Sequence, residues 1–221
     1  LGAFCALVLN RDRPQVEQGG SIGAALAEGI MVMIREPKMR LGVIVKTIND
    51  IGKFSLVILM PVYLPRFGFS IAQWLTVWGL VNLVNIFASY FFGWLGDTIG
   101  WRNTVVWFSG TLCGLAMLAV CYAPVLFGDS ETALFCALAL YAIGLGAFGP
   151  LSALIPSLLP DNKGAAISCL NLGSGLSNFV GPLIVTLCVA PLGVEGTLWV
   201  IAILYFAASV LTLPLKLPDQ G

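Results

Sequence analysis

Residues 41–64 read LGVIVKTINDIGKFSLVILMPVYL, and this stretch decides how the rest of the chain must fold. It is long enough to cross a membrane as a helix, yet it contains three charged side chains, Lys46, Asp50 and Lys53. Their spacing of i, i+4 and i+7 places them on one stripe of a helix. Asp50 then lies about 14 Å from the start of the stretch, near the middle of a hydrocarbon layer roughly 30 Å thick.

The charged stripe makes this helix marginal on its own in lipid. Each charge costs about 2.5 to 3.5 kcal/mol at bilayer depth, and the surrounding apolar side chains together return a similar amount. The stripe is tolerated if it faces neighbouring helices or a watery cavity, where Asp50 can pair with Lys46 and with Lys53. We therefore interpret it as part of a polar pathway. The alternative is an internal salt bridge that only orients the helix, with Lys46 extending to the near surface.

The composition excludes a water-soluble domain. Of the 221 residues, 58% are hydrophobic and only 10% are charged, and a soluble core cannot hide that much apolar surface. The net charge is zero, which offers no evidence for a nucleic-acid partner. The sequence also has no histidine and no CxxC pair, so the histidine-based metallopeptidases and hydrolases are excluded. We expect no catalytic residues, no metal and no other cofactor.

Five further apolar segments are long enough to cross a membrane, which makes six spans in all. We expect an all-α, polytopic membrane protein with a six-helix bundle over residues 41–216. Before it, residues 1–9 are interpreted as the end of a preceding span, and 10–40 as a cytoplasmic loop with a short interfacial helix from Ser21. Residues 217–221 are a predicted cytoplasmic tail of what we expect to be part of a longer chain. The spans are predicted at 41–64, 72–95, 104–126, 132–158, 164–191 and 194–214.

The basic residues of the predicted loops gather on one side of the membrane. The other side holds only Arg66, beside the acidic Asp129, Glu131 and Glu195. Because lysine and arginine favour the cytoplasmic side, both ends of the six-span unit are predicted to be cytoplasmic, in the inner membrane of a cell. The basic set is Arg11, Arg13, Arg35, Lys38, Arg40, Arg102, Lys163 and Lys216.

The second span carries a single polar and aromatic stripe. Trp74, Trp78, Asn82, Asn85 and Ser89 fall within roughly 80° of arc at 100° per residue. An amide at this depth is costly unless it faces protein or a cavity. Aromatic rings beside amides suit a polyhydroxylated solute, whose CH groups stack on the rings while its hydroxyls pair with the amides. The stripe is therefore predicted to contact a solute, although Trp74 alone could also be an interfacial anchor.

The fifth span presents two opposed faces. Gly173, Ser177 and Gly181 form a ridge of small residues, which favours tight helix packing. Asn171 and Asn178 lie on the other side and are predicted to contact a solute or a gate.

The fourth span contains Pro150 and Pro156, which each remove a backbone donor, so we predict a hinge there. Tyr141, in the same span, is interpreted as facing the interior. The third and sixth spans have few strongly polar residues and are interpreted as peripheral, lipid-facing scaffold.

The loop between the second and third spans reads GWLGDTIGWRN over residues 93–103. The pattern of Gly93, Asp97, Gly100 and Arg102, G-x-x-x-D-x-x-G-x-R, resembles the loop signature of the major facilitator superfamily. The glycines allow a tight reversal, and Asp97 and Arg102 are predicted to form a short-range ion pair at the helix ends. By this resemblance, the pair would help to hold a cytoplasmic gate in one conformation. The alternative is a solvated turn with an incidental surface pair.

The resemblance implies the C-terminal half of a twelve-helix transporter fold. The segment before the first complete span would be the central cytoplasmic loop, and the partner would be an N-terminal half of six helices. Within the superfamily, residues 68–78 and 163–182 resemble the polyol permeases that carry ribitol or arabinitol. Lys46 stands where that branch carries a basic residue, whereas Asp50 and Lys53 fall outside its pattern.

We hypothesise a secondary active transporter that moves a small polyol or sugar-like solute by alternating access, coupled to protons. Asp50 is the only acid deep in a span and is the candidate for a titrating or charge-balancing role. Two alternatives remain open: a carboxylate or drug carrier in which Lys46 and Lys53 clamp an anion, and a non-transporting sensor or assembly subunit. The predicted cavity residues are Lys46, Asn49, Asp50, Lys53, Trp78, Asn82, Asn85, Asn171 and Asn178.

Overall fold

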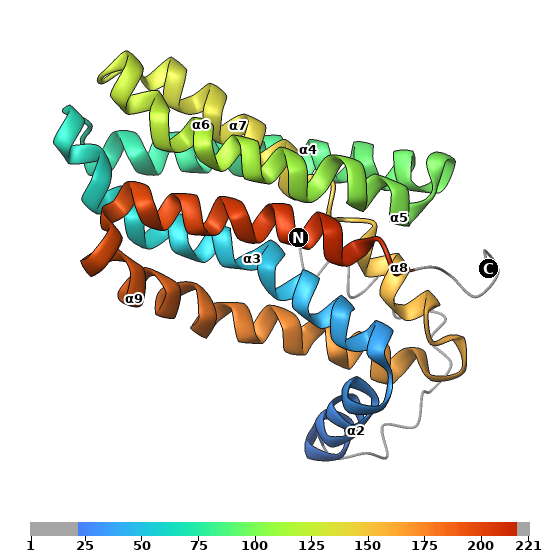
Figure 1. Cartoon of the computed structure of the whole chain (residues 1–221). Helices are drawn as coiled ribbons and strands as arrows, with labels where there is room; N and C mark the ends of the chain where they lie inside the picture. The colour runs from blue at the N-terminus through green and yellow to red at the C-terminus, as the bar shows by residue number, and fades with distance from the viewer. Residues whose placement is uncertain (1–21, 216–221) are drawn as a thin grey trace, which may run out of the picture.

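The computed structural model describes residues 22–215, and this part of the chain is a bundle of long helices with no strand (Figure 1). The expectations for residues 1–9 and 217–221, and for Ser21 as a helix cap, lie outside the described residues. In chain order the elements are α2 (Ile22–Arg35), α3 (Pro37–Tyr63), the 3-10 helix η1 (Leu64–Phe67), α4 (Ile71–Ile99), α5 (Trp101–Thr104), the π-helix η2 (Val105–Gly110), α6 (Thr111–Phe127), α7 (Glu131–Gly146), α8 (Leu151–Ser157), the 3-10 helix η3 (Pro160–Asn162) and α9 (Lys163–Thr212).

Four helical stretches in the described range are long and apolar enough to cross a membrane. They are Ile71–Ile99, Trp101–Phe127, Glu131–Ser157 and Lys163–Thr212. α3 has a comparable length, 27 residues, but its charged stripe makes it less apolar. α9 has 50 residues, far more than the roughly 20 that one crossing needs. The all-α, membrane-spanning class is confirmed, whereas the count of six spans stays a prediction.

α9 is two helices joined by a bend at Gly193. This residue has φ 71° and ψ −176°, a backbone conformation that glycine adopts without the steric cost of a Cβ. The bend separates a first arm, residues 163–192, from a second arm, residues 194–212. The two arms run in opposite directions on either side of α3 (Figure 1).

The predicted fourth span is interrupted. α7 ends at Gly146, the chain turns over residues 147–150, and α8 begins directly after Pro150. The break coincides with one of the two predicted hinge prolines, because Pro150 has no N–H to continue the helix. Pro156 lies inside α8 and interrupts nothing. Whether the break moves stays a prediction.

α3 packs most extensively against α9, and small residues allow the close approach. A Cβ at Gly173 would lie 3.0 Å from the carbonyl oxygen of Val43, and one at Gly181 would lie 3.3 Å from that of Ile51. Ser177, between them on the same face, is fully buried. The predicted packing ridge of the fifth span is therefore confirmed.

The second arm of α9, interpreted from the sequence as a lipid-facing scaffold, has one exposed face, with Trp199, Ile203 and Val210 42%, 57% and 63% exposed, and one packed face. It packs on α6 and on α3, and Tyr205 at its centre is completely buried. Tyr205 was not predicted at the centre of the bundle, because no charged or amide side chain lies near it in this arm. A tyrosine carries a polar hydroxyl on a large apolar ring and is well suited to the centre of a bundle, provided that the hydroxyl finds a partner.

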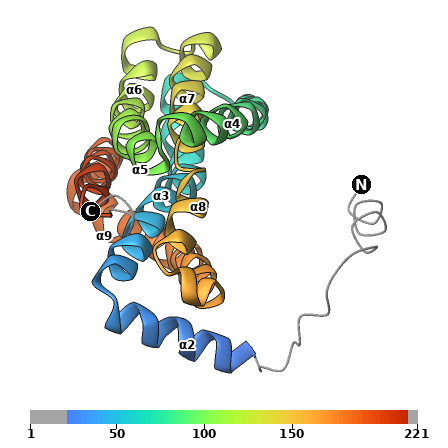
Figure 2. The same ribbon diagram turned by 90° about the vertical axis from the view of Figure 1, so that its right-hand side faces the viewer.

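α2 lies across one end of the bundle, at a steep angle to the long helices (Figure 2). It packs on the first arm of α9, where a Cβ at Gly29 would lie 3.1 Å from the Cβ of Ser168. The thiol of Cys169 donates to the carbonyl oxygen of Gly29 at 3.1 Å. The predicted short helix is thus confirmed, while its position at a membrane surface stays a prediction.

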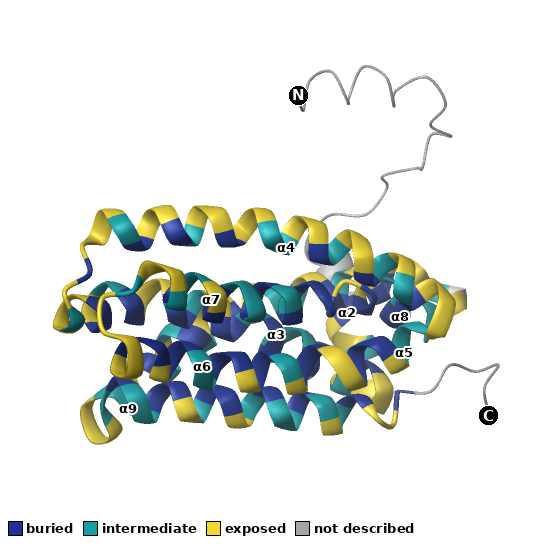
Figure 3. Ribbon diagram, turned by 90° about the horizontal axis from the view of Figure 1, so that it is seen from above, coloured by how far each residue is buried: buried dark blue, intermediate teal, exposed yellow. Residues whose placement is uncertain are grey.

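α4 stands at the edge of the bundle and packs mainly on α7. Gly146 makes this contact close, since a Cβ there would lie 2.7 Å from the Cβ of Ala88. In the most apolar 18-residue stretch of α4, only 22% is buried, against 61% in the corresponding stretch of Glu131–Ser157; the exposed outer side of α4 is visible in Figure 3. Phe87 and Tyr90 are 74% and 83% exposed. Such an apolar outer surface requires lipid or another helical unit around it.

Candidate solute groove

A narrow groove lies between α3 and α4, with α7 as its floor. Its volume is about 20 Å³, close to what a single water molecule needs, so the groove by itself is too small to enclose an organic solute. Four of the predicted cavity residues meet here, Lys53 from α3 and Trp78, Asn82 and Asn85 from α4. The complete lining is Lys53, Trp78, Val81, Asn82, Asn85, Tyr141, Ala142 and Leu145.

Lys53 brings an uncompensated positive charge to this groove. The Nζ of Lys46 lies 3.0 Å from one carboxylate oxygen of Asp50, and the Nδ2 of Asn49 donates to the other at 3.1 Å. The predicted Asp50–Lys53 pair is therefore wrong, because both oxygens of Asp50 are engaged elsewhere. Lys53 is exposed and has no ion-pair or hydrogen-bond partner among residues 22–215.

Asn49 is not a groove residue, although it was predicted to be one. Only 7% of it is exposed, since it is one helical step from Asp50 and points into the bundle. Its side-chain oxygen has no hydrogen-bond partner within the described part of the chain. Leaving a buried acceptor unpaired costs about 1 to 3 kcal/mol, so we expect the side chain of Asn49 to lower the stability of the fold by this order.

Two tyrosines connect the groove to the core, and neither was predicted as a site residue. The hydroxyls of Tyr141 and Tyr205 lie 2.8 Å apart, and Tyr205 donates to the backbone carbonyl of Asn49 at 2.9 Å. Because Tyr205 has one hydroxyl hydrogen, Tyr141 is the donor between the two rings. Gly52 provides the space, since a Cβ there would lie 2.7 Å from the Tyr141 hydroxyl. The interior position expected for Tyr141 is confirmed.

The two amide side chains in the polar stripe of α4, Asn82 and Asn85, are held by hydrogen bonds to backbone carbonyls. Asn82 donates to the carbonyl oxygen of Trp78 at 2.7 Å, and Asn85 donates across to Ala142 of α7 at 2.9 Å. Their side-chain oxygens remain as acceptors at the groove. Trp74 is 2% exposed, and its ring centroid lies 5.1 Å from that of Trp78. Trp74 is therefore a packed residue rather than an exposed interfacial anchor.

Asn171 and Asn178 do not join this groove. Both are exposed on the first arm of α9, roughly 140 to 160° around the helix from Gly173, which contacts α3. Asn178 donates to the carbonyl oxygen of Ser174 in its own helix at 2.9 Å. They can contribute to the same solute site only if a further wall completes it.

Residues 93–103, predicted as a loop, form the end of α4, the turn at Gly100 and the start of α5, and their contacts differ from the prediction. The carboxylate of Asp97 accepts from the indole N–H of Trp101 at 2.8 Å, while Arg102 donates twice to the carbonyl oxygen of Leu213, at 3.0 and 2.8 Å. The predicted Asp97–Arg102 ion pair is therefore wrong. Asp97 is bound by the nearby indole of Trp101, and Arg102 is bound to the carbonyl of Leu213, which the end of α9 leaves without a helical partner. Gly100, with φ 94°, makes the reversal.

Close packing in this segment falls on Gly96, near the end of α4. A Cβ at Gly93 would meet nothing within 4 Å, whereas one at Gly96 would lie 2.9 Å from the ring of Pro150 and 3.0 Å from that of Trp101. The loop thus rests directly on the break between α7 and α8. A shift of that break would be transmitted to the loop.

The chain is similar in sequence to one protein family and to several curated proteins. The family model described as the Major Facilitator Superfamily matches residues 110–221. The alpha-ketoglutarate permease of Bacillus subtilis (strain 168) is 44% identical over the whole chain, which covers 51% of that relative. The D-arabinitol and ribitol transporters of Klebsiella pneumoniae are 36% and 34% identical over 80% of the chain, which covers 42% of each. The chain thus spans about half the length of the curated relatives it matches.

Proposed function

Because this chain belongs to the major facilitator superfamily, we propose that it forms a six-helix half of a secondary transporter for a small organic anion. The six spans would be α3, α4, α5 to α6, α7 to α8, and the two arms of α9. The groove on α3, α4 and α7 would be one wall of the solute site, and a second helical unit would supply the other. Alternating access would then arise from rocking of the two units around the site.

The observation that carries the anion is the unpaired cation of Lys53. Asp50 already compensates Lys46 at 3.0 Å, so the stripe has one positive charge in excess. An uncompensated charge at bilayer depth is costly, and a bound carboxylate would remove that cost. This favours the carboxylate carrier over the polyol permease that the sequence motifs suggested. The name of the 44% identical relative, a permease for alpha-ketoglutarate, supports the same choice.

A polyol is the second candidate, and the α4 stripe favours it. The face of Trp78 and the side-chain oxygens of Asn82 and Asn85 could stack on CH groups and accept from hydroxyls. The names of the 36% and 34% identical relatives, transporters for D-arabinitol and ribitol, point the same way. A polyol, however, would leave the charge of Lys53 without a counter-ion.

Coupling to protons is proposed for Asp50, with Lys46 as its partner when the carboxylate is charged. Pro150 would be the hinge, and the Gly93–Arg102 loop would respond to it through Gly96. The protein would sit in the cytoplasmic membrane with α2, the α4–α5 turn and the start of α9 on the inner side. Supporting this orientation, these segments lie at the same end of the bundle (Figure 1), and Arg35, Arg102 and Lys163 belong to them or adjoin them.

Uptake by the complete native protein in proteoliposomes tests the proposal. We expect uptake of radiolabelled alpha-ketoglutarate, and a loss of at least about tenfold in Lys53→Gln, since one carboxylate–lysine contact in a dry site contributes over 1.4 kcal/mol. Lys163→Gln, which removes an exposed lysine outside the groove, is the matched control. Equal uptake by both variants would reject the anion clamp. Uptake of D-arabinitol without competition by the acid would establish the polyol reading instead.

A further inference from the structure

A second groove lies on the opposite side of α3 from the charged stripe. Its volume is about 520 Å³. Ile44, Ile48 and Ile51 form its floor, roughly 160° around α3 from the mean direction of the charged residues. Both arms of α9 form its sides, and Met33 of α2 closes one end. The lining is Met33, Arg40, Val43, Ile44, Thr47, Ile48, Ile51, Leu176, Val180, Ile184 and Leu204.

The interior of this groove offers no polar group to a ligand. Thr47 is the only uncharged polar residue of its lining, and the hydroxyl of Thr47 already lies 2.8 Å from the carbonyl oxygen of Val43 and 3.1 Å from that of Gly173. Ile44 is 45% exposed, so the apolar floor is open at this residue, whereas Ile48 and Ile51 lie deeper, at 7% and 3% exposed. A hydrocarbon chain suits such a surface, because burial there removes apolar area without leaving a polar group unpaired.

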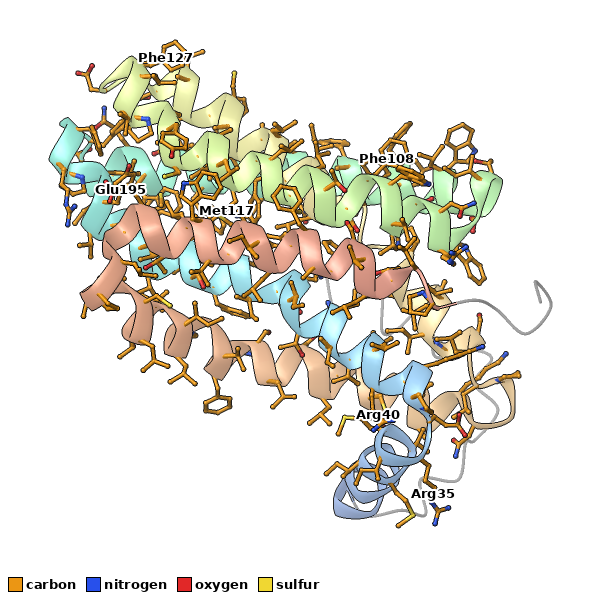
Figure 4. The ribbon with its side chains drawn as sticks, in the orientation of Figure 1. Arg35, Arg40, Phe108, Met117, Phe127 and Glu195 are labelled. Atoms are coloured by element: carbon orange, nitrogen blue, oxygen red, sulfur yellow. The ribbon has the colours of Figure 1, made fainter. Side chains whose placement is uncertain are left out.

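The one charged residue of the lining, Arg40, stands at the end next to α2. Its guanidinium is exposed and forms no hydrogen bond or ion pair within residues 22–215. Arg35 lies at the same corner of the molecule, where α2 meets α3 (Figure 4). Between them are Glu36 and Lys38, so the elbow has two positive charges in excess. This end therefore attracts an anionic group.

The length of the groove matches one leaflet of a membrane. From Arg40 to Ile51 the helix rises about 17 Å, while half of a hydrocarbon layer is roughly 15 Å. A membrane-spanning helix of another protein would require a face about twice as long. The exposed apolar side chains of α2 indicate that this end of the groove lies at the membrane surface. Beside the basic elbow, Ile30, Met31 and Ile34 are 42%, 51% and 64% exposed. A helix of this kind lies at the interface with its apolar side chains in lipid.

We propose that this groove binds one anionic phospholipid of the inner leaflet. An acyl chain lies between the two arms of α9, on the isoleucines of α3, and the phosphate group lies at Arg40 with Arg35 nearby. The site is separate from the solute groove, because the two lie on different faces of α3. Bound lipid would fill the space between three helices that carry both the charged stripe and Tyr205.

Native mass spectrometry of the complete, delipidated protein tests this site. We titrate phosphatidylglycerol and phosphatidylcholine with identical acyl chains. One phosphatidylglycerol should bind more tightly than any phosphatidylcholine. Arg40→Gln should weaken phosphatidylglycerol about fivefold and leave phosphatidylcholine unchanged, as expected for one arginine near a headgroup. Arg66→Gln, at the other end of α3, is the control and should change neither.

A second pair of variants tests the acyl-chain groove without altering charge. Ile44→Trp fills the groove and should weaken both lipids, whereas Leu183→Trp, which replaces an exposed leucine outside the lining, should weaken neither. Equal affinity of the native protein for the two lipids would overturn the proposal, as would equal behaviour of Arg40→Gln and Arg66→Gln. Detection of a dimer that Ile44→Trp abolishes would also overturn it, because a second protein chain would then occupy the groove.

Discussion

The hydroxyl of Tyr205 donates to the backbone carbonyl of Asn49 at 2.9 Å, so the second arm of α9 is fixed to the middle of α3. The contact joins the helix that carries the charged stripe to a helix with no charged residue in its centre. Through Tyr141, 2.8 Å away, the same contact reaches the floor of the solute groove. The stability of the bundle and the proposed solute site therefore depend on the same buried cluster.

Tyr205→Phe removes this link without removing the ring. We expect the free energy of unfolding to fall by about 1 to 3 kcal/mol, because the hydroxyl of Tyr141 loses its acceptor inside the bundle. The melting temperature of the purified protein in detergent measures the loss. Tyr90→Phe is the control, since Tyr90 is 83% exposed. The cluster would not be structural if both variants melted at the same temperature.

Gly52→Ala introduces a methyl group into the same cluster. The new Cβ would lie 2.7 Å from the Tyr141 hydroxyl and would also meet Tyr205, so we expect a loss of about 1 to 3 kcal/mol by overpacking. At Gly79 a Cβ would meet nothing within 4 Å. Gly79→Ala should therefore stabilise α4 by up to about 1 kcal/mol, through helix propensity alone. Thermal melting of the two variants should move in opposite directions.

Asp50→Asn removes the partner of Lys46 and leaves two uncompensated cations on α3. We expect a loss of about 2 kcal/mol in stability, between the values for exposed and fully buried pairs, together with loss of uptake. Adding Lys46→Gln should restore the melting temperature, because the unpaired charge disappears with it, but uptake should not return. Restored uptake in the double variant would exclude a titrating role for Asp50.

The loop after α4 offers a test that separates the observed contacts from the ion pair suggested by its sequence. Asp97→Ala and Trp101→Phe remove the same hydrogen bond, so their effects on the melting temperature should not add. Asp97→Ala and Arg102→Gln remove different contacts, and their effects should add within about 0.5 kcal/mol. Coupling between Asp97 and Arg102, with none between Asp97 and Trp101, would support the ion pair.

The helices could be predicted from the sequence to within a few residues, because apolar length and turn residues are local signals. The ridge of Gly173, Ser177 and Gly181 could be predicted in the same way, since residues four apart lie on one side of a helix. The bend at Gly193 coincides with the predicted boundary between the fifth and sixth spans. The break at Pro150 follows from chemistry that proline carries wherever it stands.

The site was predicted less well because its contacts join residues that are distant in sequence. Asn49 was placed beside Asp50 in the cavity, although neighbours on a helix point about 100° apart and Asn49 is buried in the bundle. Asp97 and Arg102 were paired because they are close in sequence, whereas the acceptor for Arg102 is Leu213, at the far end of the chain. Lys53 was predicted to pair with Asp50, and its unpaired charge follows only from the contacts that Asp50 makes with Lys46 and Asn49.

The bend of α9 has a mechanical consequence. The reversal contains a single non-helical residue, Gly193, and both arms pack on α3, so we expect the two arms to move together as one hairpin. Any displacement of Asn171 and Asn178 toward a solute would pull Tyr205 in the same stroke, and α3 with it. Closure of the outer polar surface and repositioning of the charged stripe would then be one movement rather than two.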